Sequence, residues 1–133
     1  MIVVDTNVIA YLWIPGTRTH DAEKLLSQDP EWIAPLLWRS EFCNILAGYL
    51  RQKHINLETA QQLIEAAESQ MEGAEYSVSS PHVLKLAGQS KCSAYDCEFV
   101  ALAQDLERPL VTADKQVLSA VPKLAFAIDK FVN

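Results

Sequence analysis

The sequence predicts an α/β fold in which helices cover both faces of a parallel sheet. Two observations support this prediction. Short apolar segments lack the alternation of a half-exposed strand, and the longer segments between them have helical periodicity. Strands of this kind are buried on both faces, and an intervening helix lets consecutive strands run parallel. Because 133 residues is a typical domain length, we expect residues 1–133 to form a single domain.

Five short segments are candidate strands. The first is a β-branched run that ends at Asp5, and the fourth begins directly after Pro109. The third is the weakest of the set. The expected strands cover residues 2–4, 32–35, 75–78, 110–112 and 124–128.

Helical patterns occupy most of the remaining chain. We expect helices over 20–28, 36–51, 57–71, 80–88, from 93 to about 106, and a short one from 114. Ser80 before Pro81 is the expected N-cap of the fourth helix. Apolar stripes predict which helix faces are buried, and they include Trp38, Phe42, Ile45, Leu46 and Tyr49 in the second helix, Leu57, Leu63 and Ala67 in the third, and Tyr95, Phe99 and Leu102 in the fifth.

Composition narrows the possible environments and partners. The chain has 11 basic and 17 acidic residues, a net charge of −6, which argues against binding nucleic acid through charge alone. Cys43, Cys92 and Cys97 are odd in number and form no CxxC pair, so we expect free thiols in a reducing compartment. No signal peptide or membrane-spanning segment is apparent, which predicts a cytoplasmic protein without a membrane partner.

Four acidic residues occupy positions that are unusual for surface acids. Asp5 and Asp114 follow the first and fourth strands, Glu41 flanks an apolar stripe, and Asp96 lies on the buried side of its helix. Ordinary structural roles also fit them. Asp5 and Asp114 could be N-caps, Glu41 could be a boundary carboxylate, and Ser93 with Asp96 has the spacing of a capping box.

In a parallel sheet these four acids converge on one edge. Carboxylates placed so close together repel one another and require cations. With no histidine or cysteine partner, ligation by oxygen alone favours Mg²⁺ or Mn²⁺ over zinc. A site with one or two such ions suits hydrolysis of phosphodiester bonds.

Four segments carry a family resemblance, and they span nearly the whole chain. They resemble the four motifs of PIN-domain ribonucleases, in the order of that family. The segments are Val3-Val4-Asp5-Thr6-Asn7-Val8-Ile9, Ser40-Glu41-Phe42, Ser93-Ala94-Tyr95-Asp96 with Val100-Ala101-Leu102-Ala103, and Leu110-Val111-Thr112-Ala113-Asp114. The compact length resembles that of stand-alone VapC-type toxins of toxin–antitoxin pairs.

The resemblance implies a three-layer α/β/α sandwich with a central, mostly parallel sheet. It also implies endonucleolytic cleavage of RNA that depends on one or two Mg²⁺ or Mn²⁺ ions. A homodimer and a small antitoxin protein that inserts a segment into the active site are the implied partners. The implied catalytic and metal-binding residues are Asp5, Glu41, Asp96 and Asp114, supported by Thr6, Asn7, Ser93 and Thr112. The further acid that some members carry after the last motif is absent, because Gln116, Val117 and Leu118 follow Asp114.

Basic residues near the quartet are candidate phosphate contacts. Arg39, Lys91 and Lys115 each lie within five residues of a quartet acid. The alternative is that they are solvated surface cations. Trp13 is a candidate interface or substrate residue, whereas Trp38 belongs to an apolar stripe and is expected in the core.

Other functions remain open at this point. An RNA-processing nuclease without an antitoxin would share the same motifs. A haloacid-dehalogenase phosphatase would have a second Asp where Asn7 stands, and a phospho-receiver would have an acidic pair after the first strand. A non-catalytic acidic interaction module is a further alternative, although the complete quartet argues against it.

Overall fold

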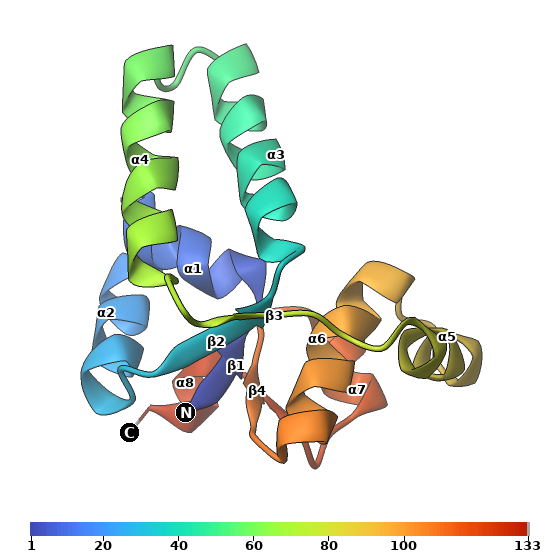
Figure 1. Ribbon diagram of the computed structural model, residues 1–133. Coiled ribbons are helices and arrows are strands. Elements are labelled where there is room, and N and C mark those ends of the chain that lie inside the picture. The colour runs from blue at the N-terminus through green and yellow to red at the C-terminus, as the bar shows by residue number, and fades with distance from the viewer. Residues whose placement is uncertain (133) are drawn as a thin grey trace.

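The computed structural model describes residues 1–132 and contains a five-stranded, all-parallel sheet with helices on both faces (Figure 1). The predicted fold class is therefore confirmed. The strands are β1 (Ile2–Val4), β2 (Trp32–Pro35), β3 (Glu75–Tyr76), β4 (Leu110–Val111) and β5 (Ala125–Phe126). Their order across the sheet is β3-β2-β1-β4-β5, so the two sides of β1 are built by different parts of the chain.

Eight helices surround this sheet in the described part of the chain. They are α1 (Thr6–Trp13), α2 (Thr19–Gln28), α3 (Trp38–Arg51), α4 (Leu57–Gln70), α5 (Ser80–Gln89), α6 (Ala94–Leu106), α7 (Lys115–Ala120) and α8 (Ile128–Phe131). α1 packs against α2, α3 and α4, whereas α6 packs against α5 and against β1, β2 and β4. α3 and α4 form a long hairpin that extends beyond the sheet (Figure 1).

The core is centred on β1, whose three residues are fully buried. Trp38 and Phe42 of α3 meet edge to face with ring centroids 6.0 Å apart, and both side chains are completely buried. The Trp38 indole donates a hydrogen bond of 2.7 Å to Oε2 of Glu75, at the start of β3. Packing and this bond together fix the first turn of α3 against the sheet, and the prediction that Trp38 is a core residue is confirmed.

The direction of strand addition reverses at β1. From β1 the chain builds one half of the sheet through β2 and β3, and then returns to build the other half through β4 and β5. Ligands of open parallel α/β sheets bind at the carboxyl ends of the strands where the order reverses. The carboxyl ends of β1 and β4 are therefore the expected place for a functional site.

Several expected elements differ from the structure. Residues 6–13 form α1, which was not expected, because Thr6, Val8, Ile9 and Ala10 are all buried and leave no polar face. The expected strand over 124–128 is divided between β5 and α8, which begins at Ile128. The expected strand 75–78 has only two residues in the sheet.

Three predictions about single residues are also wrong. The N-cap of α5 is Ser79, whose hydroxyl accepts a bond from the backbone N–H of His82, so Ser80 is the first residue of the helix. Leu57 and Tyr95 were expected on buried stripes, but they are 61% and 63% exposed. Both lie at the first or second residue of a helix, where the apolar stripe extends past the packed surface.

The three cysteines are free thiols, as expected. None of the helices described for residues 1–132 is both long enough and apolar enough to cross a membrane.

Candidate active site

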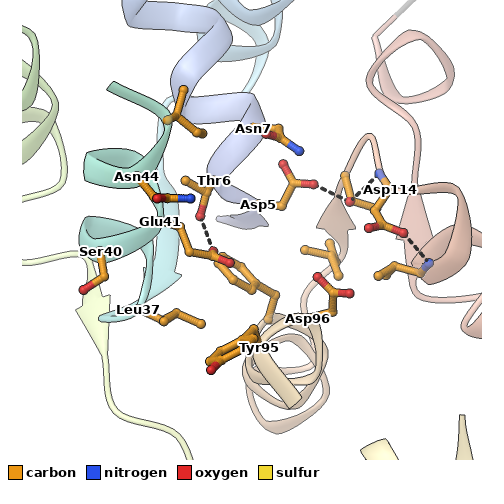
Figure 2. A pocket seen from close by; sticks show the side chains of 15 residues that line it. Asp5, Thr6, Asn7, Leu37, Ser40, Glu41, Asn44, Tyr95, Asp96 and Asp114 are labelled. Atoms are coloured by element: carbon orange, nitrogen blue, oxygen red, sulfur yellow. Dashed lines mark hydrogen bonds between the residues drawn. The ribbon is translucent and has the colours of Figure 1, made fainter. Parts of the chain in front are cut away.

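All four carboxylates of the predicted quartet line one pocket of about 410 Å³. Figure 2 shows Asp5 and Asp114 on one side of the pocket, with Glu41 and Asp96 facing it from two further helices. Asp5 follows β1 and Asp114 lies three residues beyond β4, while Glu41 and Asp96 occupy the first turns of α3 and α6. The parallel sheet thus brings together residues separated by more than one hundred positions.

Asp5 is held by three hydrogen bonds from two different parts of the chain. Its Oδ1 accepts from the N–H of Val8 at 3.0 Å, which makes Asp5 the N-cap of α1. Its Oδ2 accepts from the N–H of Ala113 at 3.1 Å and from the Thr112 hydroxyl. The same hydroxyl oxygen accepts the N–H of Asp114 at 3.0 Å. These bonds tie the residues after β1 to those after β4 and restrict the orientation of Asp5.

Glu41 is oriented by a hydroxyl on a neighbouring helix. The Thr6 hydroxyl donates a bond of 2.7 Å to Oε1 of Glu41 (Figure 2). Thr6 is only 5% exposed, so its own geometry is fixed by packing. Because Thr6 adjoins Asp5 in the chain, this bond links the β1 end of the pocket to α3.

Asp96 and Asp114 also fulfil the structural roles considered for them. The Ser93 hydroxyl caps α6 by accepting the N–H of Asp96 at 3.1 Å. Oδ1 of Asp114 caps α7 by accepting the N–H groups of Gln116 at 2.8 Å and Val117 at 3.1 Å. The cap of α7 uses one carboxylate oxygen of Asp114, whereas burial raises the pKa of the Asp96 carboxyl and hydrogen bonds from the side chain and backbone of Ser93 lower it. Capping therefore coexists with a pocket-facing carboxylate at both positions.

Burial and repulsion from neighbouring acids both disfavour ionisation of Asp5, Glu41 and Asp96. Desolvation raises the pKa of Asp5, and the charge of Asp114 adds to this increase. Desolvation also raises the pKa of Glu41, with further repulsion from Asp96 and Asp5. The pKa of Asp96 is raised by desolvation and then by Asp114. A cation close to these three carboxylates would therefore stabilise their ionised forms.

The donor chemistry of the pocket fits a hard divalent cation. It offers four carboxylates and no sulfur or imidazole donor, a set that suits Mg²⁺ or Mn²⁺. In residues 1–132, no three His, Cys, Asp or Glu side chains are gathered into a preformed metal site. The raised pKa values and the oxygen-only lining support a cation that would draw these groups together.

The other predicted site residues fall into two groups. Thr6, Asn7 and Thr112 line the pocket, whereas Ser93 does not line it and is the N-cap of α6. The three predicted phosphate contacts, Arg39, Lys91 and Lys115, are not among the lining residues.

Arg39 is engaged on the side of α3 that faces α4 and β3. Its guanidinium makes two bonds to Glu75, at 2.5 and 2.7 Å, and pairs with Glu68 at 3.0 Å. Trp13, considered above as a substrate or interface residue, donates from its indole to Gln70 of α4 at 2.7 Å. Both side chains thus have partners within the fold.

The pocket contains residues that sequence reasoning missed. Ser40 and Asn44 of α3 line it beside Glu41, although neither was among the candidate site residues (Figure 2). Leu37 and the exposed Tyr95 complete its mouth. The available signal was spacing, because Ser40 and Asn44 lie within one turn of Glu41. On α3, the residues that line the pocket lie directly beside the residues that pack into the core. An apolar stripe identifies the core residues but does not show which polar residues beside it line a pocket.

The fold and the pocket together define an α/β/α protein with an acidic site at the carboxyl ends of its parallel strands. The sequence profile of the PIN domain matches residues 2–124, and the chain belongs to the PIN domain family. The family that the sequence resembles is thereby confirmed.

Individual relatives agree with this assignment. The chain is 30% identical over 127 residues to Ribonuclease VapC3 from Pyrobaculum aerophilum, a match that covers 92% of this chain and 96% of the relative. Among solved structures it is similar to PAE2754 from Pyrobaculum aerophilum, with a TM-score of 0.79, 18% identity and coverage of 98% and 92% of the two chains. A toxin–antitoxin complex from Klebsiella pneumoniae matches with a TM-score of 0.69, 18% identity and coverage of 96% and 98%. At this identity the solved structures support the fold.

Proposed function

We propose that this chain is an endoribonuclease that hydrolyses RNA phosphodiester bonds with Mg²⁺ or Mn²⁺. The observation that carries the proposal is the convergence of Asp5, Glu41, Asp96 and Asp114 on one pocket of a PIN domain. The similarity to a protein named a ribonuclease, which extends over nearly the whole chain, supports RNA as the substrate.

In this proposal the four carboxylates hold one or two ions, and the neighbouring hydroxyls position the carboxylates. A bound divalent ion would activate water for attack on the phosphorus and stabilise the leaving oxygen. Thr112 and the N–H of Ala113 orient Asp5, while Thr6 orients Glu41. The capping bonds of Asp114 leave its Oδ2 without an intramolecular donor among the bonds described. These contacts fix the ligands before substrate binds, which lowers the cost of organising the site.

We further propose that the nuclease is the toxin of a toxin–antitoxin pair and acts in the cytoplasm. Support comes from the VapC relative and from the fold shared with a toxin–antitoxin complex. A small antitoxin protein and a second copy of the chain are the proposed partners. Co-expression with the product of an adjacent small reading frame tests the first, because an antitoxin should copurify and suppress cleavage. The molar mass in solution tests the homodimer.

Cleavage of a panel of labelled RNAs tests the proposed activity. We expect Mg²⁺ or Mn²⁺ to support cleavage by the wild type, and we expect Asp96→Asn to remove it while the fold is retained. Asp129→Asn is a matched control, because Asp129 is exposed in α8 and lies outside the pocket. Equal activity of wild type and Asp96→Asn would reject Asp96 as a site residue. No cleavage of any RNA with either ion would reject the proposed function.

A further inference from the structure

A second cavity continues the candidate active site along α1 and α3. Its volume is about 230 Å³, and it shares Asn7 and Ile45 with the carboxylate pocket. From these shared residues it runs past Tyr11 of α1 and Tyr49 of α3. The segment 14–18 and the start of α2 close its far end. The two cavities therefore adjoin at Asn7 and Ile45, and we call the second one the α1–α3 groove.

The α1–α3 groove differs from the carboxylate pocket in its charge. The pocket is lined by four acids and by no Lys or Arg. The α1–α3 groove is lined by Arg18 and by no Asp or Glu. The chain has a net charge of −6, and among its described residues Arg18 is the only Lys or Arg that lines either cavity. A polyanion bound in the acidic pocket would have the positive charge of Arg18 on one side of that pocket.

Arg18 is held in place by an aromatic ring. Its guanidinium carbon lies 5.0 Å from the centre of the Tyr11 ring, a cation–π arrangement. Its Nε lies 3.6 Å from Oδ2 of Asp21, and both side chains are 40% exposed. An exposed pair at this separation is weak, so the guanidinium is available to a phosphate.

The remaining lining fits a nucleotide. Tyr11 and Tyr49 provide aromatic rings, and Thr17, Thr19 and Asn7 provide polar groups. Aromatic rings beside a cation are the usual elements that bind single-stranded nucleic acid without strong sequence preference. The Tyr49 ring also lies 6.1 Å from the His54 ring, at the end of α3, which extends the aromatic surface away from the pocket.

We propose that the α1–α3 groove binds the part of the RNA strand that adjoins the scissile bond on one side, with Arg18 on a phosphate and Tyr49 against a base. This inference rests on the proposed ribonuclease function, because it assigns a substrate path to the same site. Arg18 is a binding residue in this account and has no part in the chemical step. Asp21 competes with the phosphate for Arg18.

Binding of a fluorescent single-stranded RNA of about eight nucleotides, a length within the range that single-strand-binding domains cover, tests the groove directly. All variants carry Asp96→Asn so that the RNA stays intact, and affinity is read by fluorescence anisotropy with Mg²⁺ present. Arg18→Gln is expected to weaken binding about fivefold, and Asp21→Asn is expected to strengthen it about twofold, because exposed charge pairs have effects of this size. Arg108→Gln is the control, because Arg108 is exposed at the amino end of β4, the edge of the sheet opposite the pocket.

Salt dependence separates a phosphate contact from a structural effect. Loss of one phosphate contact to a single strand should reduce the slope of log K against log salt concentration by about 0.7. Arg18→Lys should restore this slope, because it retains the charge. If Arg18→Gln proves unstable, Tyr49→Ala tests the same groove, with an expected loss of about fivefold from lost stacking.

Kinetics on the native background distinguish this proposal from the proposed function. If the wild type cleaves RNA, Arg18→Gln should raise KM about fivefold and leave kcat unchanged, as expected for uniform binding. Cleavage with the same KM and the same salt slope in wild type and Arg18→Gln would overturn the groove and leave the ribonuclease intact. That result would also be expected if the groove served a protein partner. A wild type that cleaves no RNA would reject the proposed function itself.

Discussion

The hydroxyl of Thr112 donates a hydrogen bond to Oδ2 of Asp5, across 107 positions of the sequence. The same oxygen accepts the N–H of Asp114, so one side chain connects the acids that follow β1 and β4. Thr112 is only 1% exposed, and no solvent replaces its bonds if the hydroxyl is lost. The relative position of the two carboxylates thus depends on a residue with no charge of its own.

Thr112→Val should therefore impair both stability and activity. The substitution keeps the shape of the side chain but removes one of the two donors to Oδ2 of Asp5 and leaves the N–H of Asp114 without its partner. We expect the free energy of unfolding to fall by about 1–3 kcal/mol, and kcat for RNA cleavage to fall with it. Urea unfolding and cleavage rates measure the two effects. Thr59→Val in α4 is the control, and an equally small effect of both substitutions would contradict the role given to Thr112.

Asp96→Asn should stabilise the metal-free protein increasingly as the pH rises. Burial and Asp114 raise the pKa of Asp96 above its ordinary value of 3.8. The folded state therefore binds more protons than the unfolded state between 3.8 and the raised pKa, and the wild type loses stability as pH rises through that window. Asn does not titrate. The unfolding free energy of the variant minus that of the wild type, measured in chelator, should increase with pH and then level off.

A divalent cation should reduce this difference. In the proposed site, Mn²⁺ would bind the ionised carboxylates of the folded wild type and stabilise it by mass action. Asn at position 96 removes one of the proposed ligands, so the variant should gain less. A pH-independent difference in chelator, or an equal gain of both proteins in Mn²⁺, would contradict the assignment of Asp96 to an acidic cation site.

RNA cleavage should decline on the acid side at a higher pH than ordinary carboxylates would produce. Burial is the main cause of the raised pKa values of Asp5, Glu41 and Asp96, and repulsion from neighbouring acids adds to it. Only ionised carboxylates hold a divalent ion well, so activity should fall as pH drops through these raised values. The rate at saturating RNA, measured against pH at low and high Mn²⁺, provides the test. More Mn²⁺ should shift the acid limb to lower pH, and an unmoved limb would contradict the account.

Glu75→Gln should destabilise the fold at neutral pH by weakening the attachment of α3 to β3. Glu75 accepts from the Trp38 indole and from two nitrogens of Arg39, and the Arg39 bond is the largest reason that its pKa is lowered from 4.5. This stability is present above 4.5 and is lost as pH falls through the lowered pKa. Denaturant unfolding across the acid range measures it. Glu72→Gln, at an exposed neighbouring position, should have little effect at any pH, and a matching loss there would contradict the specific role of Glu75.

The sequence predicted the sheet well because its strands are short apolar runs with clear ends. Asp5 terminates β1 and Pro109 precedes β4, so the two strands that flank the reversal were placed within one residue of their positions. α1 was missed because residues 8–13 are apolar throughout and give no helical periodicity. The division of 124–128 depends on the cap at Ala127, whose alanine side chain provides no sequence signal.

The sequence predicted that the four acids share one site because the sheet and helix backbones determine where each acid lies. Residues that follow parallel strands meet at one edge, and Glu41 and Asp96 begin the helices that face this edge. Ser40 and Asn44 were missed because both are polar and exposed, and the sequence does not distinguish exposed residues that line a pocket from other exposed residues. The engagement of Arg39 by Glu68 and Glu75 depends on tertiary packing of α3, α4 and β3, which no local pattern encodes. The contribution of Arg39, Lys91 and Lys115 to RNA binding stays a prediction.

Metal-restored RNA cleavage tests the central claim most directly. One preparation of the wild type is assayed on labelled RNA with Mn²⁺, then in excess chelator, and again after Mn²⁺ is restored. We expect cleavage in the first and third conditions and none in the second, with Asp96→Asn inactive throughout. Cleavage that persists in chelator, or that Asp96→Asn retains with Mn²⁺, would contradict the claim that these carboxylates form a metal-dependent ribonuclease site.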